Sequence, residues 1–265
     1  MGVNRLYKYL DAKGGLMMLK GSNLQFTNAT QLNDPFDCHP GLFDYSNANT
    51  RAAKVFGKEL IGRGEFVNAN TLRNETWICS LSKVYNNLLM WSYYNGHKGV
   101  CIGLNKEKTK DCLSHICNGV YIGAQEMEVQ YKDIIEKKDF FHGDYFENFK
   151  YQLSTKAKDW EHEQEVRFLL IDPTPSVVPH HPSFATMALP PGDKYEKAKY
   201  VDWTEVRAYP EISAECFESL YLGVRIENED KNNIVEIARK RNPNIKIFQM
   251  KPNPEAFRLM EEEIN

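Results

Sequence analysis

The pattern Glu163-x-Glu165-x-Arg167 brings two carboxylates and a guanidinium together on one short stretch of the chain. Because residues two apart on a strand lie on the same face, we expect the two acid side chains about 6.5 to 7 Å apart. A fixed carboxylate that also grips a sugar hydroxyl stabilises a cationic, oxocarbenium-like transition state more than the ground state. The pattern therefore predicts Glu165 and Glu163 as catalytic residues. A salt-bridge ladder along the strand, with Arg167 neutralising Glu165, is the structural alternative.

Aromatic and turn residues elsewhere in the chain indicate a cleft for a flat ring. Trp91 and Tyr94 are three residues apart, so on a helix they share a face and could stack such a ring; core packing accounts for them equally well. His97 lies in a turn between two glycines, where it is expected either to titrate in a site or simply to lie at the surface. Asn33 and Asp37 belong to a polar turn, and they either line the cleft or spend their hydrogen bonds on the turn itself.

Four motifs occur together in this chain: Leu6-Tyr7-Lys8-Tyr9, Asn33-Asp34-Pro35-Phe36-Asp37, the stretch from Cys79-Ser80-Leu81-Ser82 through Met90-Trp91-Ser92-Tyr93-Tyr94 to His97-Lys98-Gly99, and Trp160-x-x-Glu163-x-Glu165-x-Arg167. Their combination resembles a bacterial family known only as domain of unknown function 2971. The resemblance runs through nearly the whole chain and includes Tyr221-Leu222-Gly223 near its end. The family name carries no function.

The order of the polar positions is more distantly similar to the ADP-ribosyltransferase superfamily. There, a first-strand His or Arg holds the NAD ribose, a Ser, Thr or Tyr supports the nicotinamide side, and the last glutamate steadies the ribose. The resemblance implies NAD as substrate, with Lys8, Ser80 or Ser82, and Glu165 at the matching positions and Tyr9 beside them in the binding site. Arg167 lies on the same strand face as the glutamates, where it is expected either to clamp pyrophosphate or to neutralise Glu165. Glu165 would steady the ribose and Glu163 would face the incoming nucleophile. Lys8 departs from the pattern, because an ammonium lacks the planar fork of Arg and the acceptor of His.

These residues favour an NAD-dependent ADP-ribosyltransferase-like or NAD-hydrolysing enzyme, with a toxin or phage-defence setting among its expected roles. A non-catalytic nucleotide-binding or regulatory module of the same fold would use the same pocket without turnover. A glycoside hydrolase is a third hypothesis, since the expected carboxylate separation falls within the range of inverting glycosidases. The sequence shows no nucleophile elbow, Gly-rich phosphate loop or zinc-ligand spacing, so no metal cofactor is expected.

Charge and composition narrow the partners. The 33 basic and 36 acidic residues give a net charge of -3, so no general field attracts nucleic acid or anionic lipid. No apolar stretch has the length of a signal peptide or a membrane span, which predicts a cytoplasmic protein without a membrane partner. The six cysteines lack paired C-x-x-C spacing and are interpreted as free thiols. The expected partners are a nucleotide-like small molecule and a macromolecular acceptor that the sequence does not identify.

The elements that must position these residues follow from hydrophobic periodicity. Alternating or continuous apolar runs predict strands at 6–10, 24–27, 77–82, 100–104, 127–131, 166–171, 201–209, 219–224 and 245–250. Helical spacing predicts helices at 16–20, 51–61, 88–94, 145–160 and 232–241, with a helix-to-strand junction near Glu161. The segment 172–193 holds six of the twelve prolines, and it is expected to be either a binding loop or a variable insertion. Together these predict one α+β domain over 1–265, with a mixed, largely antiparallel central sheet flanked by helices and an ADP-ribosyltransferase-like fold.

Overall fold

The structure, a computed structural model, describes residues 4–44, 46, 73–117, 120–122, 124–140, 145–171 and 205–264. The predicted helix at 51–61, the segment 172–193 and the first part of the strand predicted at 201–209 lie outside the described residues. Among the described helices, none combines the length and the apolarity that a bilayer span needs.

A largely antiparallel, open sheet of ten strands organises the described residues, which confirms the predicted mixed α and β class. Its main path runs, in order, through β13 (Arg207–Ala208), β2 (Phe26–Asn28), β4 (Thr76–Ser82), β1 (Arg5–Leu10), β5 (Val100–Asn105), β14 (Phe217–Leu222), β15 (Lys246–Pro252) and β16 (Leu259–Glu263). Neighbouring strands along this path run antiparallel except β14 and β15, which are parallel. The edge strand β16 is absent from the sequence-based prediction, because its three consecutive glutamates follow no alternating pattern.

The sheet branches at β4. Strand β12 (Glu165–Ile171) pairs with β4 along its whole length, from Glu165 opposite Ser82 to Ile171 opposite Thr76, and pairs on its other side with β8 (Gln125–Glu128). On the opposite edge of β4, strand β1 occupies one end and β2 the other. Between the described residues of β1 and those of β4, only Tyr7 and Ser82 are paired with each other. The two strands therefore separate beyond this pair.

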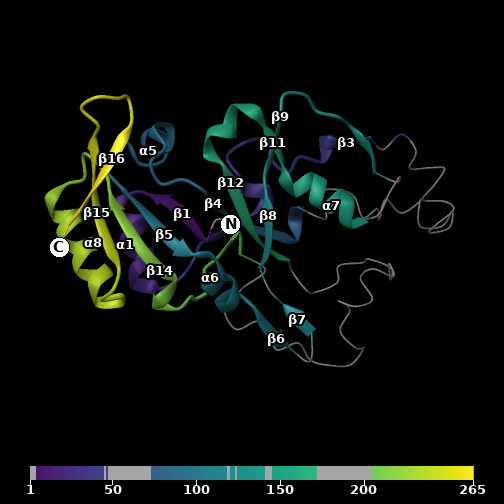
Figure 1. Cartoon of the computed structure of the whole chain (residues 1–265). Coiled ribbons are helices and arrows are strands. Elements are labelled where there is room, and N and C mark those ends of the chain that lie inside the picture. The colour runs from purple at the N-terminus through teal and green to yellow at the C-terminus, as the bar shows by residue number, and fades with distance from the viewer. Residues whose placement is uncertain are drawn as a thin grey trace.

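The helices cover opposite faces of the sheet (Figure 1). Leu6 of β1 packs in the main hydrophobic core with residues of α1 (Ala12–Gly21) and α8 (Asn228–Arg241), which contact each other. Tyr7 and Tyr9, which point the other way because side chains alternate along a strand, pack instead with α5 (Leu88–Asn95). Gly96 ends α5 in the left-handed conformation with φ of +56°, as the Asn-Gly pair predicts.

Three small sheets complete the described strands: β10 (Lys138–Asp139) with β3 (Phe43–Asp44), β11 (Thr155–Ala157) with β9 (Gln130–Lys132), and β6 (His115–Cys117) with β7 (Val120–Ile122). Helix α6 (Lys106–Leu113) follows β5 directly. Figure 1 shows α7 (Tyr145–Ser154) at the end of the molecule away from α8.

The helix predicted at 145–160 is wrong in its second half. Helix α7 ends at Ser154, the next three residues form β11, and a 3₁₀ helix covers Lys158–Glu163. The apolar residues at helical spacing that predicted this helix are buried as far as Leu153, which packs with Phe149 in a separate hydrophobic cluster. Beyond it, backbone pairing of β11 with β9 overrides the local helical period, because tertiary contacts outweigh intrinsic propensity.

Candidate functional site

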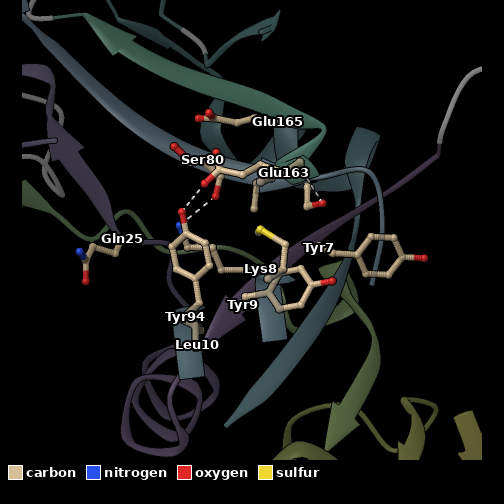
Figure 2. Close-up of a pocket in the computed structure, with 12 residues that line it drawn as sticks. Tyr7, Lys8, Tyr9, Leu10, Gln25, Ser80, Tyr94, Glu163 and Glu165 are labelled. Atoms are coloured by element: carbon tan, nitrogen blue, oxygen red, sulfur yellow. Dashed lines mark hydrogen bonds between the residues drawn. The ribbon is translucent and has the colours of Figure 1, made fainter. Parts of the chain in front are cut away.

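A pocket of about 180 Å³ opens where β1 and β4 separate (Figure 2). It is lined by Tyr7, Lys8, Tyr9 and Leu10 of β1, by Ser80, Leu81 and Ser82 of β4, by Met90 and Tyr94 of α5, and by Gln25, Glu163 and Glu165. The structure thus brings to one pocket the first-strand lysine, both strand serines and both glutamates that the sequence singles out.

Lys8 is the cation that spans the split between the two strands. Its ammonium donates to the carbonyl oxygen of Ser80 at 2.9 Å, at a level where β1 and β4 are no longer paired. Tyr9, the neighbouring residue, lines the same pocket and donates its hydroxyl hydrogen to the carbonyl oxygen of Val84 at 2.9 Å. Burial raises the pKa of Tyr9, so this hydroxyl stays protonated.

Glu163 reaches the pocket from a turn and not from a strand, contrary to the sequence expectation. It is the last residue of the 3₁₀ helix, and Gln164, with φ of 45°, takes the left-handed conformation that ends that helix before β12 begins. The carboxylate accepts hydrogen bonds from the Tyr94 hydroxyl on one oxygen and from Lys156 Nζ, at 2.5 Å, on the other. Ser82 Oγ anchors the turn by donating to the carbonyl oxygen of Glu163 at 2.7 Å.

Glu165, the first residue of β12, lies at the back of the pocket and is surrounded by donors. Arg167 donates to it through Nε at 2.8 Å and through a terminal nitrogen at 3.1 Å, and Lys156 donates at 2.9 Å. Burial opposes ionisation of this carboxyl, but the charges of Arg167 and Lys156 outweigh burial and hold the pKa of Glu165 well below its ordinary value.

Arg167 is fully buried and is not among the residues that line the pocket. Its two terminal nitrogens form a bidentate pair with Asp37, at 2.9 and 2.6 Å, and one of them also donates to the carbonyl oxygen of Leu153 at 2.9 Å. A clamp on pyrophosphate is therefore wrong for this residue, because its donors are spent inside the protein. Arg167 instead forms an ion pair with Glu165, as the salt-bridge alternative predicted.

Lys156 completes a buried ion network that the sequence did not reveal. It is 8% exposed and contacts Glu163 and Glu165, with Asp37 at 3.9 Å. Burial lowers the pKa of this ammonium, but the nearby carboxylates outweigh it and raise the pKa above its ordinary value. The predicted helix at 145–160 included Lys156, and a lysine on such a helix is normally exposed to solvent. The sequence therefore offers no reason to expect Lys156 in a buried network.

The two glutamates differ in their remaining capacity to accept hydrogen bonds. An ionised carboxylate offers about four lone-pair positions. Glu165 accepts three hydrogen bonds, two from Arg167 and one from Lys156. Glu163 receives one hydrogen bond from Tyr94 and one from Lys156. Glu163 is therefore the pocket carboxylate with more acceptor positions open to a ligand.

Trp91 does not take part in the pocket, contrary to the proposed ring stacking. Its side chain is fully buried, its indole N–H donates to the carbonyl oxygen of Tyr85 at 2.7 Å, and its ring packs edge-on against Tyr9. Core packing, the alternative explanation, is correct for this residue. Tyr94, on the next turn of α5, is 40% exposed and lines the pocket. Trp91, its predicted stacking partner, does not line it.

Three further predicted residues lie elsewhere. His97 takes a left-handed conformation after Gly96, outside the pocket lining, and burial together with Arg225 lowers the pKa of its imidazole. Asn33 is exposed on the turn at 33–37, also away from the pocket. Asp37 is buried against Arg167 behind Glu165, so it supports the pocket without lining it.

The comparisons with known proteins concern part of the chain. Residues 90–168 match a family model described as a protein of unknown function, DUF2971. This stretch holds Tyr94, both pocket glutamates and Arg167, while Lys8 and the strand serines precede it. No curated protein and no solved structure matches the chain. Within the described ranges, no group of three or more His, Cys, Asp or Glu side chains is placed to hold a metal ion.

Proposed function

We propose that the pocket binds the nicotinamide-ribose end of NAD and that the protein is an ADP-ribosyltransferase-like or NAD-hydrolysing enzyme. The observation that supports this most is the meeting of Lys8, Ser80 and Glu165 in one pocket, from three strands far apart in sequence. These are the positions that the superfamily resemblance singles out for NAD. The volume of about 180 Å³ is below the roughly 300 to 1,000 Å³ of pockets that enclose a drug-sized ligand, so it suits one end of a dinucleotide.

The chemistry needs a group that stabilises a cationic sugar. When the bond between the anomeric carbon and the nicotinamide nitrogen breaks, the electron pair leaves with nicotinamide and the ribose becomes oxocarbenium-like. Glu163, with open acceptor positions, stabilises that charge and takes the proton of the water or hydroxyl that attacks the anomeric carbon. Lys156 and Tyr94 hold the Glu163 carboxylate in place from either side. Glu165 then does not contact the ribose. Its role is to hold Lys156, which in turn positions Glu163.

A nucleotide-binding module without turnover is the second candidate, and one observation favours it. Glu165, the residue that the resemblance makes essential, is buried and already accepts three hydrogen bonds from protein donors. The glycoside hydrolase hypothesis loses support. Both glutamates bind the same Lys156 ammonium, at 2.5 and 2.9 Å, which places them closer than the roughly 6.5 to 9.5 Å that inverting enzymes leave for water.

The experiment is incubation of the purified protein with NAD, with free nicotinamide measured by chromatography. The enzyme hypothesis expects release by the wild-type protein and a loss of about 10²-fold or more in Glu163→Gln, the range for one lost electrostatic stabiliser. Glu165→Gln, the matched variant in the same pocket, should mainly lower the melting temperature. NAD binding by calorimetry without nicotinamide release would support the module, and absence of binding would contradict both candidates.

A further inference from the structure

Two cysteines far apart in sequence are in direct sulfur contact on the side of β5 that carries α6. Cys112 lies on the last turn of α6, and Cys216 ends a 3₁₀ helix, Ala214–Cys216, that leads into β14. Their sulfur atoms are 3.7 Å apart across a separation of 104 residues. Of the described free thiols, these two form the pair in sulfur-to-sulfur contact.

We propose that Cys112 and Cys216 are a redox modification site, a dithiol that closes reversibly to a disulfide. A disulfide needs the sulfurs at about 2.0 Å, which from van der Waals contact requires side-chain rotation and a small approach of the two segments. Helix α6 and the 3₁₀ helix already pack against each other and against β5, so the approach moves neighbours that are in contact.

The two thiols differ in a way that assigns their order of reaction. Cys112 is partly exposed, and the backbone N–H of Ser213 donates to its sulfur at 3.3 Å. Cys216 is fully buried, and burial together with Cys112 raises the pKa of its thiol to about 12. Cys112 is therefore the thiol that meets an oxidant from solvent, and Cys216 resolves the product.

With hydrogen peroxide as the oxidant, the step balances as follows. The Cys112 thiolate attacks one peroxide oxygen, the O–O bond breaks, and a sulfenic acid and one water form after proton transfer. The Cys216 sulfur then attacks the Cys112 sulfur, the S–O bond breaks, and a second water leaves with the Cys216 proton. Two thiols lose two electrons in total, and the peroxide is reduced to two waters.

The cross-link would have a physical consequence for the fold. A bridge that closes a loop of this length restricts the unfolded chain and so stabilises the folded one. We expect the melting temperature of the oxidised protein to rise by about 5 °C or more over the reduced protein. Reduction with dithiothreitol should reverse the rise, which irreversible oxidation of a single thiol would not allow.

The test is peroxide treatment of the full-length native protein, followed by blocking of free thiols, trypsin digestion without reductant and mass spectrometry. The expected product joins peptide 111–132 to peptide 208–225 with the loss of two hydrogens. Because peptide 111–132 also contains Cys117, Cys117→Ser is the matched control and should keep the cross-link. Cys112→Ser and Cys216→Ser should each abolish the cross-link and the rise in melting temperature.

Each contrary result overturns the proposal. A cross-link between peptides that persists in Cys112→Ser and is lost in Cys117→Ser would assign the chemistry to Cys117. Recovery of the blocked thiols, or of sulfinic acid on Cys112 without any cross-link, would show that the pair does not close. The wild-type digest shows whether the two peptides are joined even when a serine variant fails to fold, and Cys117→Ser then shows whether Cys112 is the cysteine in the bridge. None of these readouts depends on NAD.

Discussion

The hydroxyl of Tyr94 donates to the carboxylate of Glu163, and this bond joins an exposed helix to a buried ion network. Burial and Glu163 together raise the pKa of the Tyr94 hydroxyl, so it remains a donor at neutral pH. The same Glu163 carboxylate is held on its other oxygen by Lys156. A half-exposed hydroxyl on α5 thus helps to orient the pocket carboxylate that has more open acceptor positions.

Removal of this hydroxyl should weaken the site without unfolding the protein. We expect Tyr94→Phe to lower the rate of nicotinamide release about tenfold, the equivalent of one lost hydrogen bond, because Glu163 loses one of its two supports. Tyr93→Phe, at the exposed neighbouring position, is the matched control and should leave the rate unchanged. Equal rates for both variants would show that the hydroxyl does not position Glu163.

Loss of the buried cation Lys156 should destabilise the fold strongly. In Lys156→Met, the Glu163 and Glu165 carboxylates lose a buried partner, and we expect the free energy of unfolding to fall by about 3 to 5 kcal/mol. Urea denaturation measures this directly. Lys158→Met, two residues on, removes only a surface pair with Asp133 and should leave the denaturation midpoint unchanged. A small effect at Lys156 would mean that water enters the network.

The depressed pKa of Glu165 predicts an acid-sensitive fold. A carboxyl whose pKa is lower in the folded than in the unfolded chain contributes stability that is present above its ordinary pKa of 4.5 and is lost as the pH falls toward the folded value. Urea denaturation between pH 7 and about pH 3 should therefore show falling stability below about pH 4.5. The fall should be shallower in Glu165→Gln than in the exposed control Glu229→Gln. Parallel curves would contradict the linkage.

Trp91 should behave as a core residue. Because its ring is fully buried and its indole N–H is bonded inside the protein, Trp91→Ala should lower the free energy of unfolding by about 3 to 5 kcal/mol. The affinity of the remaining folded protein for NAD, measured by calorimetry at low temperature, should change little. A selective loss of NAD affinity with unchanged stability would instead show that Trp91 contributes to NAD binding.

Local sequence patterns determined most of the strands and the pocket-lining helix α5. Alternation around Tyr7 and Tyr9 and the continuous apolar run of β12 define β1 and β12, because a strand's side-chain period is written in its own residues. Asn-Gly at the end of α5 predicts its stop for the same local reason. Lys8 and Ser80 could be named in advance from the superfamily resemblance, and Glu165 also from its place in the Glu163-x-Glu165-x-Arg167 pattern.

Only the tertiary structure decided what each polar residue does. Arg167 can clamp a ligand or neutralise a carboxylate, and its partner Asp37, 130 residues earlier in the chain, settles that choice. Lys156 enters the network because pairing of β11 with β9 ends the helix, a long-range contact that carries no local signal. Glu163 keeps more open acceptor positions than Glu165 because Arg167 and Lys156, from two different strands, together supply three donors to Glu165. Spacing along one strand determines which side chains share a face, whereas hydrogen-bond saturation depends on every segment that surrounds them.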